Sequence, residues 1–269
     1  DSIRKTFEKK GVEMCFYHQD KDWNPLDIEV KEDDAVLLVN YYGIMSSERM
    51  TELAKPYVHI IIDCAQAFFC HPVKGALTVY SCRKFVGVPD GAYVIGKDAH
   101  KYVEEYPQCY SSDTATFLLK RIEYGCEGKG YEARSLNEHR IDTEDCMQMS
   151  KLTRTLMDAE DYIYNQQKRK ENFTYVHRCL SGINKIEPTR YMDEETIPMV
   201  YPLVVEDDAL IQKLFAVKHF QGHWWSYICE EQSVESFEYW ISRYIIPITI
   251  DQRYGKEEMD YLVNVIKNK

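Results

Sequence analysis

An aspartate and a lysine stand at the ends of two neighbouring apolar segments of the sequence. Asp63 ends the run "VHIIID", and Lys84 follows shortly after the run "ALTVYS". The two residues are 84 − 63 = 21 positions apart, which leaves room for one loop and one strand between them. Ligands of open α/β sheets bind beyond the carboxyl ends of the strands. We therefore expect both side chains to face one crevice.

A carboxylate and a lysine amine in one crevice suit the chemistry of pyridoxal phosphate. A lysine amine bonds covalently to the aldehyde of this cofactor, and a carboxylate beside the ring nitrogen keeps that nitrogen protonated. Lys84 suits the first role and Asp63 the second. The lysine must also release its proton, and the neighbouring positive charge of Arg83 would lower its pKa and help it to do so.

Two further polar side chains near this pair are candidate cofactor ligands. The hydroxyl of Ser81, just before Lys84, can donate a hydrogen bond to a phosphate, and Gln66, just after Asp63, can reach the ring oxygen. These residue types also have ordinary structural explanations. An aspartate at a strand end is more often a helix cap or turn former, and a lysine before a Pro-Asp-Gly turn is usually solvated. Spacing alone leaves the cofactor a minority interpretation.

The elements that would position these residues alternate between strand and helix. The run "VHIIID" is almost wholly apolar, which is typical of a parallel strand covered on both faces. The alternation predicts an α/β fold with a mostly parallel sheet. Apolar runs predict strands over 12–17, 35–40, 58–63, 76–81 and 91–96, and helical patterns cover 1–11 and 46–57.

A long helical pattern separates this region from a second one. Further helices are predicted over 98–106 and 111–128, and then one long helix from Thr143 to about Leu180, whose apolar residues recur at helical spacing. Such a helix commonly bridges two lobes. We therefore predict a large cofactor-binding lobe over 1–160 and a small α/β lobe over 161–269. The small lobe should hold strands at 197–205 and 245–250 and helices at 207–220, 233–244 and 255–268.

Composition argues against several classes of partner. The chain has 33 basic and 44 acidic side chains and a net charge of −11, whereas a nucleic-acid partner would need a basic face. No apolar run is long enough to span a membrane. The nine cysteines form no C-x-x-C pair, so no zinc site or other metal is expected. Reduced, buried thiols in a cytoplasmic protein are the simplest interpretation.

Several stretches resemble the DegT/DnrJ-type aminotransferases. The most specific are "IIIDCAQAFF" and "TVYSCRKFVGVPDGAYVIG", which carry Asp63, Gln66, Ser81 and Lys84 at positions that match the family pattern. The run "VLLVNYYG" looks like the preceding family strand, with Asn40 where the family often has histidine. Two other segments, "QQKRKENFTYVHRCL" and "YIIPITIDQRYGKEEMDYLVNVI", are similar to the family's long helix and closing segment.

The resemblance implies a fold-type-I pyridoxal phosphate enzyme. Such an enzyme would transfer an amino group from glutamate or glutamine to a keto sugar, nucleotide-linked, in the biosynthesis of surface polysaccharides or deoxyamino sugars. It would work as a homodimer. The resemblance gives Lys84 and Asp63 the catalytic roles, and it adds Asn40 to Gln66 and Ser81 as residues that contact the cofactor.

Two departures from the family pattern leave alternatives open. The spacing of Ser81 and Lys84 is shorter than in most members that act on sugars, so the substrate stays undecided. The family's glycine-rich phosphate-binding turn lies upstream of the matched segments. We therefore expect either a fragment of a longer enzyme or a natural short form. The alternatives are another fold-type-I enzyme, such as an amino-acid aminotransferase or a lyase, and a non-catalytic partner subunit.

Three smaller features have more than one interpretation. An amino-acid substrate would need an arginine from the small lobe for its carboxylate, and the sequence does not rank the candidates. The polar stretch "SLNEHR" is interpreted as a loop whose Asn137 reaches the phosphate of a partner subunit. The aromatic stretch 220–227, "FQGHWWSY", fits buried packing better than a substrate pocket. The candidate arginines are Arg169, Arg178, Arg190 and Arg253.

Overall fold

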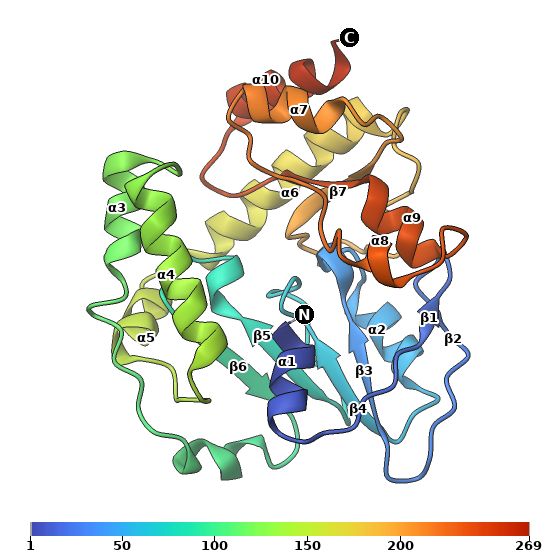
Figure 1. The fold of residues 1–269 in the computed structure, drawn as a ribbon, viewed down its shortest axis with the longest axis vertical. Helices are drawn as coiled ribbons and strands as arrows, with labels where there is room; N and C mark the ends of the chain where they lie inside the picture. The colour runs from blue at the N-terminus through green and yellow to red at the C-terminus, as the bar shows by residue number, and fades with distance from the viewer. Residues whose placement is uncertain (1, 269) are drawn as a thin grey trace.

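A four-stranded sheet forms the centre of the first half of the chain. The computed structural model describes residues 2–268. The strands are β3 (Ala35–Val39), β4 (His59–Asp63), β5 (Leu77–Ser81) and β6 (Ala92–Ile95), and they are hydrogen-bonded in this order. β4 runs parallel to both β3 and β5, whereas β6 runs antiparallel to β5. The prediction of an α/β fold with a mostly parallel central sheet is confirmed (Figure 1).

Short helices and turns connect the strands. The helix that follows β3 begins after Ser46, whose hydroxyl accepts a hydrogen bond from the backbone N–H of Arg49, as expected of an N-cap. The connecting elements are α2 (Ser47–Ala54) and the 3₁₀ turns η1 (Tyr41–Gly43) and η2 (Cys82–Lys84), while α1 (Ser2–Lys9) precedes the sheet and the 3₁₀ helix η3 (Ala99–Glu105) follows it.

The strand predicted over 12–17 does not form. These residues are irregular, and the only pairing nearby is between two short strands, β1 (His18–Gln19) and β2 (Pro25–Leu26). A strand needs a neighbour to satisfy its backbone groups. The apolar residues of 12–17 have no such neighbour among the described residues, so an apolar run alone was a misleading signal.

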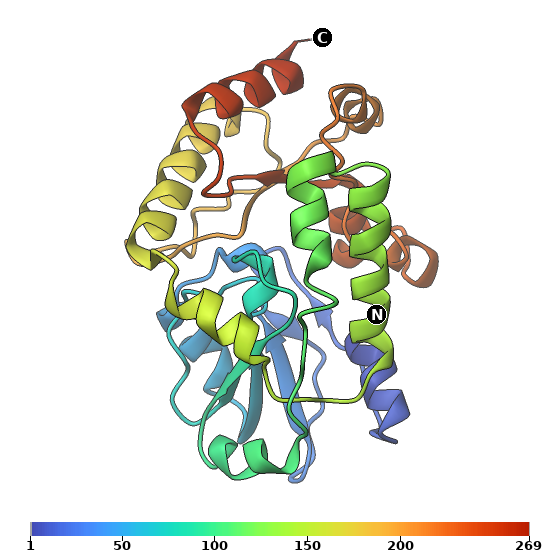
Figure 2. The same ribbon diagram turned by 90° about the vertical axis from the view of Figure 1, so that its left-hand side faces the viewer.

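A helical hairpin stands beside the sheet. It consists of α3 (Thr116–Tyr124) and α4 (Lys129–Thr143), which pack against each other and lie side by side in both views (Figures 1 and 2). The stretch "SLNEHR" belongs to α4, so its interpretation as a loop was wrong. α4 lacks a clear apolar stripe, and the packing on α3 rather than hydrophobic periodicity stabilises it.

The long helix predicted from 143 to 180 is two helices. α5 spans Lys151–Asp158 and α6 spans Tyr162–Leu180. The chain breaks between them because Asp161 acts as an N-cap, its carboxylate accepting a hydrogen bond from the backbone N–H of Tyr164 at 2.9 Å. The apolar periodicity continues across this break, which is why the sequence pattern did not reveal it.

A two-stranded sheet organises the remainder of the chain. β7 (Val200–Val204) pairs antiparallel with β8 (Ile245–Thr249). Both strands are almost wholly buried, and α6 packs against β7 and against the last helix. Figure 2 shows α6 running from the level of the central sheet up to this second region. The other helices are α7 (Leu210–Ala216), α8 (Ile228–Glu231), α9 (Phe237–Tyr244) and α10 (Lys256–Lys267).

The two regions share one hydrophobic core. A single cluster of buried apolar residues joins strand residues such as Leu38 and Ile62 to Tyr201 and Ile248 of the second sheet. The division predicted between residues 160 and 161 coincides with the break before α6 and stays a prediction. Of the helices in the described part of the chain, none combines the length and the apolarity needed to cross a bilayer.

Candidate active site

Asp63 and Lys84 lie at the same edge of the central sheet. Asp63 is the last residue of β4 and is in register with Val39 of β3 and Val79 of β5. β5 continues in the same direction through Ser81 and leads directly into η2, which ends at Lys84. The two side chains are close enough for their charges to interact. The structure therefore brings the predicted carboxylate and amine together beyond the carboxyl ends of neighbouring parallel strands.

The amine of Lys84 has the properties that a reactive lysine needs. Its side chain is exposed, and no hydrogen bond or ion pair from residues 2–268 engages the amine. The surrounding protein nevertheless removes enough water to lower the pKa of Lys84; the charge of Arg83 lowers it as well, whereas Asp63 and Glu138 act in the opposite direction. An amine that loses its proton more readily is a better nucleophile and proton carrier near neutral pH.

Asp63 forms a turn and still has a carboxylate oxygen available. Its Oδ1 accepts a hydrogen bond from the backbone N–H of Ala65 at 2.8 Å, and its backbone carbonyl accepts one from Asn40 at 3.0 Å. The second carboxylate oxygen has no hydrogen-bond donor in the described chain. The side chain is half-buried. It thus combines the ordinary turn-forming role with a free oxygen that can face a cationic group.

Asn40 and Gln66 are buried and engaged with the chain itself. The amide of Asn40 donates to the carbonyl of Met45 at 2.8 Å and accepts from the Met45 N–H at 3.2 Å. Gln66 accepts a hydrogen bond from the N–H of Tyr42 at 2.7 Å. These contacts hold η1, where Tyr42 and Gly43 both have positive φ angles. Direct contact of these two amides with a cofactor stays a prediction, and what the geometry shows is a structural role.

Ser81 and Asn137 differ in how free their side chains are. Ser81 ends β5, and its hydroxyl has no hydrogen-bond partner among residues 2–268, so it can donate to a ligand. Asn137 is buried in α4, where its amide donates to the carbonyl of Pro89 at 3.1 Å. This contact ties α4 to the turn that follows Lys84. In this structure Asn137 therefore stabilises its own subunit through its contact with Pro89.

The segment after Lys84 is held by residues from the second half of the chain. Sequence reasoning missed Gln252 and named Arg169 only as one of four unranked candidates for binding a substrate carboxylate. Gln252 donates to the carbonyl of Phe85 at 2.8 Å, and the guanidinium of Arg169 lies 4.7 Å from the centre of the Phe85 ring. Arg169 is 1% exposed, donates to the carbonyl of Met199 and lies 3.6 Å from Asp251. Burial lowers the pKa of Arg169 to about 10, against the opposing effect of Asp251. The sequence pattern of the helix did not predict that Arg169 is buried.

The four arginines that the sequence did not rank are now distinguishable. Arg169 is buried, whereas Arg178 stacks on the ring of Tyr175. Arg190 forms an ion pair with Asp22, in the loop between β1 and β2. Arg253 pairs with Asp251 at 2.8 Å and keeps 67% of its side chain exposed. Asp251 also contacts Arg169, and Arg169 in turn contacts Phe85 just after Lys84. Of the four arginines, Arg253 is therefore the exposed one that is linked through Asp251 to this segment.

The aromatic stretch 220–227 packs at the end of β3. Trp224 stacks on Tyr42 with ring centres 6.0 Å apart, and Trp225 meets Tyr41 edge-on at 5.6 Å. Tyr42 is fully buried, and its hydroxyl has no hydrogen-bond partner within residues 2–268. The geometry therefore shows the predicted packing role: this aromatic stretch packs directly against η1.

Solved structures of aminotransferases share this arrangement of elements. The chain superposes on a sugar aminotransferase from Micromonospora echinospora with a TM-score of 0.63 and 16% identity, over 97% of this chain and 76% of the other. It has the fold of these aminotransferases. A DegT DnrJ EryC1 StrS aminotransferase from Brucella abortus gives a TM-score of 0.60 at 15% identity, over 95% and 73% of the two chains.

A third structure extends the range of similar aminotransferases. An aminotransferase of Helicobacter pylori that is involved in pseudoaminic acid biosynthesis gives a TM-score of 0.58 at 13% identity, over 96% of this chain and 74% of the other. The chain therefore spans about three quarters of the length of these structures. No protein-family model and no curated protein sequence matches it. At these identities the similarity establishes the fold-type-I architecture alone.

Proposed function

We propose that the protein is a pyridoxal phosphate-dependent aminotransferase that acts on a keto sugar carried by a nucleotide. The observation that carries the proposal is the placement of Asp63 and of the unengaged amine of Lys84 at the same carboxyl edge of a mostly parallel sheet. The fold of the similar aminotransferases supports the same conclusion. The proposed setting is surface-polysaccharide or deoxyamino-sugar biosynthesis in the cytoplasm.

The residues of the site fit the cofactor. Lys84 would hold its aldehyde, Asp63 would keep a proton on its ring nitrogen, and Ser81 would donate to its phosphate. When bound, the cofactor supplies an electron sink for the carbon that bears the amino group. Lys84, with its lowered pKa, would take the proton from that carbon and return it to another. Asn40 and Gln66 would keep η1 in place at the rim of the site.

Two other functions compete with this proposal. An amino-acid aminotransferase or a lyase of the same fold would need a cation for a substrate carboxylate, and the exposed guanidinium of Arg253 is the best candidate. A non-catalytic partner subunit would keep the fold without the chemistry. The available amine of Lys84 favours an enzyme, since a structural subunit has no need of an unengaged, partly desolvated lysine.

A homodimer is part of the proposal. The hairpin of α3 and α4 carries large apolar side chains that are strongly exposed, an arrangement that usually marks a contact surface. A second copy of the chain would cover them. The proposed partners are therefore a second subunit, an amino donor such as glutamate or glutamine, and the sugar, with no nucleic acid or membrane. The exposed residues include Leu119 at 65%, Ile122 at 83%, Tyr131 at 63% and Leu136 at 72%.

Reductive labelling tests the cofactor assignment. The protein is incubated with pyridoxal phosphate, treated with borohydride to make the attachment permanent, and mapped by peptide mass spectrometry. We expect the label on Lys84 at low cofactor concentration, and its loss in Lys84→Ala. Lys74 is an exposed lysine just before β5, at the end of that strand opposite to Lys84, so Lys74→Ala serves as the control and should keep the label. Equal labelling of Lys74 and Lys84 would contradict the proposal.

Turnover assays then separate the candidate functions. A nucleotide-linked keto sugar and a 2-keto acid are offered as alternative acceptors, with glutamate as the donor. We expect amination of the sugar, and a fall in turnover of about 10²–10⁴-fold in Lys84→Ala. Amination of the keto acid alone would favour the amino-acid enzyme. Labelling at Lys84 without turnover of either acceptor would favour the non-catalytic subunit.

A further inference from the structure

The backbone that directly follows Lys84 is held by one side chain from the second region. Nε2 of Gln252 donates to the carbonyl oxygen of Phe85 at 2.8 Å, and among residues 2–268 no other group donates to this oxygen. Because a carbonyl oxygen only accepts, the NH₂ side of the Gln252 amide must be the side that faces it. The main chain next to Lys84 is therefore tied to the connection between β8 and α10.

Gln252 is presented by a turn that is itself well held. The carboxylate of Asp251 accepts hydrogen bonds from the backbone N–H and from Nε of Arg253, at 2.9 and 2.8 Å. The buried amide of Asn172, in α6, donates to the carbonyl of Asp251 at 3.2 Å and to that of Tyr254 at 3.0 Å. These contacts fix the position from which the Gln252 side chain reaches across to the first region.

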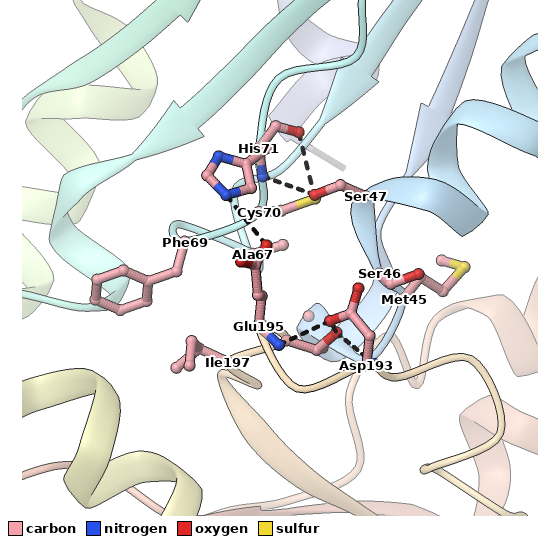
Figure 3. A pocket seen from close by; sticks show the side chains of 12 residues that line it. Met45, Ser46, Ser47, Ala67, Phe69, Cys70, His71, Asp193, Glu195 and Ile197 are labelled. Atoms are coloured by element: carbon pink, nitrogen blue, oxygen red, sulfur yellow. Dashed lines mark hydrogen bonds and ion pairs between the residues drawn. The ribbon is translucent and has the colours of Figure 1, made fainter.

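The ring of Phe85 is held as firmly as its carbonyl. Phe85 is 3% exposed, and its ring centre lies 5.8 Å from that of Phe68 and 5.7 Å from that of Phe69. Phe69 also lines a small hollow, together with Ser47 and Asp193 (Figure 3). The space in this hollow is about 10 Å³, enough for roughly one water molecule. The packed rings therefore have little room to shift.

The turn further along the same segment is held by two helices. Asn137 of α4 donates to the carbonyl of Pro89 at 3.1 Å. The backbone N–H and the hydroxyl of Ser150, at the start of α5, donate to the two carboxylate oxygens of the buried Asp90 at 2.9 and 2.8 Å. The segment 85–90 is thus fixed at both ends, and the contact with Gln252 is the one next to Lys84.

The amide of Gln252 also has an unsatisfied atom. Its Oε1 is buried and has no donor within the described part of the chain. A buried acceptor without a partner disfavours the folded state. An apolar side chain of the same shape would avoid this cost, and the hydrogen bond to Phe85 is what it would lose. That hydrogen bond is therefore the property that distinguishes glutamine at this position.

We propose that Gln252 is a positioning residue for Lys84. By holding the carbonyl of Phe85, it keeps the end of η2, and with it the Lys84 side chain, at the carboxyl edge of the sheet where Asp63 also lies. The importance of this position for catalysis rests on the proposed function. The position itself can be measured in the protein without any cofactor.

The loss of this contact has a predictable consequence for the Lys84 amine. Dehydration is the main cause that lowers the pKa of Lys84, and the charge of Arg83 acts with it. Asp63 and Glu138 act in the opposite direction. If the segment is released, the amine gains water, and its pKa should rise toward that of an exposed lysine. Gln252→Met changes no charge, so such a rise would report a change of position.

Competitive acetylation of the cofactor-free protein tests the proposal. The rate at Lys84 is compared with the rate at the exposed Lys74 over a pH series, in the wild type, Gln252→Met and Gln148→Met. Gln148 is a matched control because its Nε2 donates to the carbonyl of Tyr106 at 2.8 Å, in a different part of the chain. We expect the Lys84 profile to move toward that of Lys74 in Gln252→Met only. No movement, an equal movement in both variants, or a wild-type profile that already matches Lys74 would overturn the proposal.

Amide hydrogen exchange gives a second readout that does not depend on the amine. The N–H groups of Phe85 and Val86 both donate to the carbonyl of Cys82, at 3.1 and 3.0 Å. Their exchange should be about 2–10-fold faster in Gln252→Met, the effect of losing one hydrogen bond, and unchanged in Gln148→Met. Gln252→Glu keeps the shape of the side chain, but its carboxylate cannot donate to a carbonyl, so it should show the same acceleration. Unchanged exchange in both variants of Gln252 would contradict the proposed role.

These outcomes are separable from that of the cofactor labelling. Label on wild-type Lys84 together with an unshifted profile in Gln252→Met would leave the proposed function standing and remove the positioning role. A shifted profile in Gln252→Met without label on the wild type would confirm the positioning role and remove the proposed function.

Discussion

The reactivity of Lys84 depends on a balance of neighbouring charges and dehydration. Partial dehydration by the surrounding protein and the charge of Arg83 favour the neutral amine of Lys84, whereas Asp63 and Glu138 favour the ammonium. Arg83 and Glu138 also pair with each other at 2.7 Å. A change at any of these residues should therefore move the pH at which Lys84 loses its proton, even with no cofactor present.

The direction of that shift can be predicted. In the folded protein the pKa of Lys84 lies below its usual value of 10.5, so the amine becomes reactive at a lower pH than exposed lysines do. Asp63→Asn removes a negative charge that stabilises the ammonium and keeps the oxygen that accepts from Ala65. It should shift the pKa further down. Arg83→Gln removes a positive charge and frees Glu138, and should shift it up.

Competitive acetylation across a pH series measures these shifts. The rate at Lys84 is compared with the rate at Lys74 in the same sample, so that differences in reagent cancel. Opposite shifts in the two variants would support the charge balance described above. A Lys84 profile that follows Lys74 in all three proteins would show that the lysine is an ordinary solvated side chain.

At the scale of the elements, α6 links the region of the central sheet to the region of the second sheet. It packs against β7 and α10, and the carboxylate of Asp161 fixes where it begins. Asp161→Ala should cost about 0.5–2 kcal/mol of unfolding free energy, because the N–H of Tyr164 loses its acceptor. Denaturant unfolding monitored by tryptophan fluorescence measures this change.

The control for this prediction is three positions earlier. Asp158 ends α5, where a negative charge is unfavourable to the helix dipole. Asp158→Ala should therefore leave stability unchanged or raise it slightly. Equal destabilisation by the two substitutions would indicate a general effect of removing an acidic residue rather than the loss of a cap.

At the scale of the whole molecule, one buried arginine joins the two halves behind Lys84. Arg169 contacts Phe85, Met199 and Asp251, which come from three separate segments. Arg169→Met should cost about 3 kcal/mol, since it leaves buried polar groups without their partner. Arg178→Met, on the exposed face of the same helix, should cost less than about 1 kcal/mol. Similar unfolding midpoints for the two variants would contradict the assigned role of Arg169.

Assembly is the second property of the whole molecule that can be tested. Sedimentation should give a dimer, and Ile122→Asp should produce monomers because a charge would be placed in the apolar contact surface of the hairpin. Val58 is exposed to 81% in a different part of the chain. Val58→Asp should therefore leave the dimer intact. A monomeric wild-type protein would exclude the proposed dimer.

The sequence by itself determined the class of fold and the identity of the residues at the sheet edge. Runs of branched apolar residues define β3, β4 and β5, and the side chain that follows each run must appear where the strand ends. Local signals of this kind predicted that Asp63 and Ser81 lie at strand ends and that Lys84 follows shortly after, as they do at the ends of β4, β5 and η2. Where the signal was only apolar content or periodicity, as at 12–17 and across Asp161, it misled, because pairing partners and caps are not visible in hydrophobicity.

Only the tertiary structure decided which of these side chains are free to act. Asn40, Gln66 and Asn137 are polar and well placed in sequence, yet their amides hold the chain's own backbone. Arg169 acquires its burial and its contacts from residues that are distant in sequence. Burial and charge depend on everything within a few ångströms of a side chain, and the order of residues alone does not specify those neighbours.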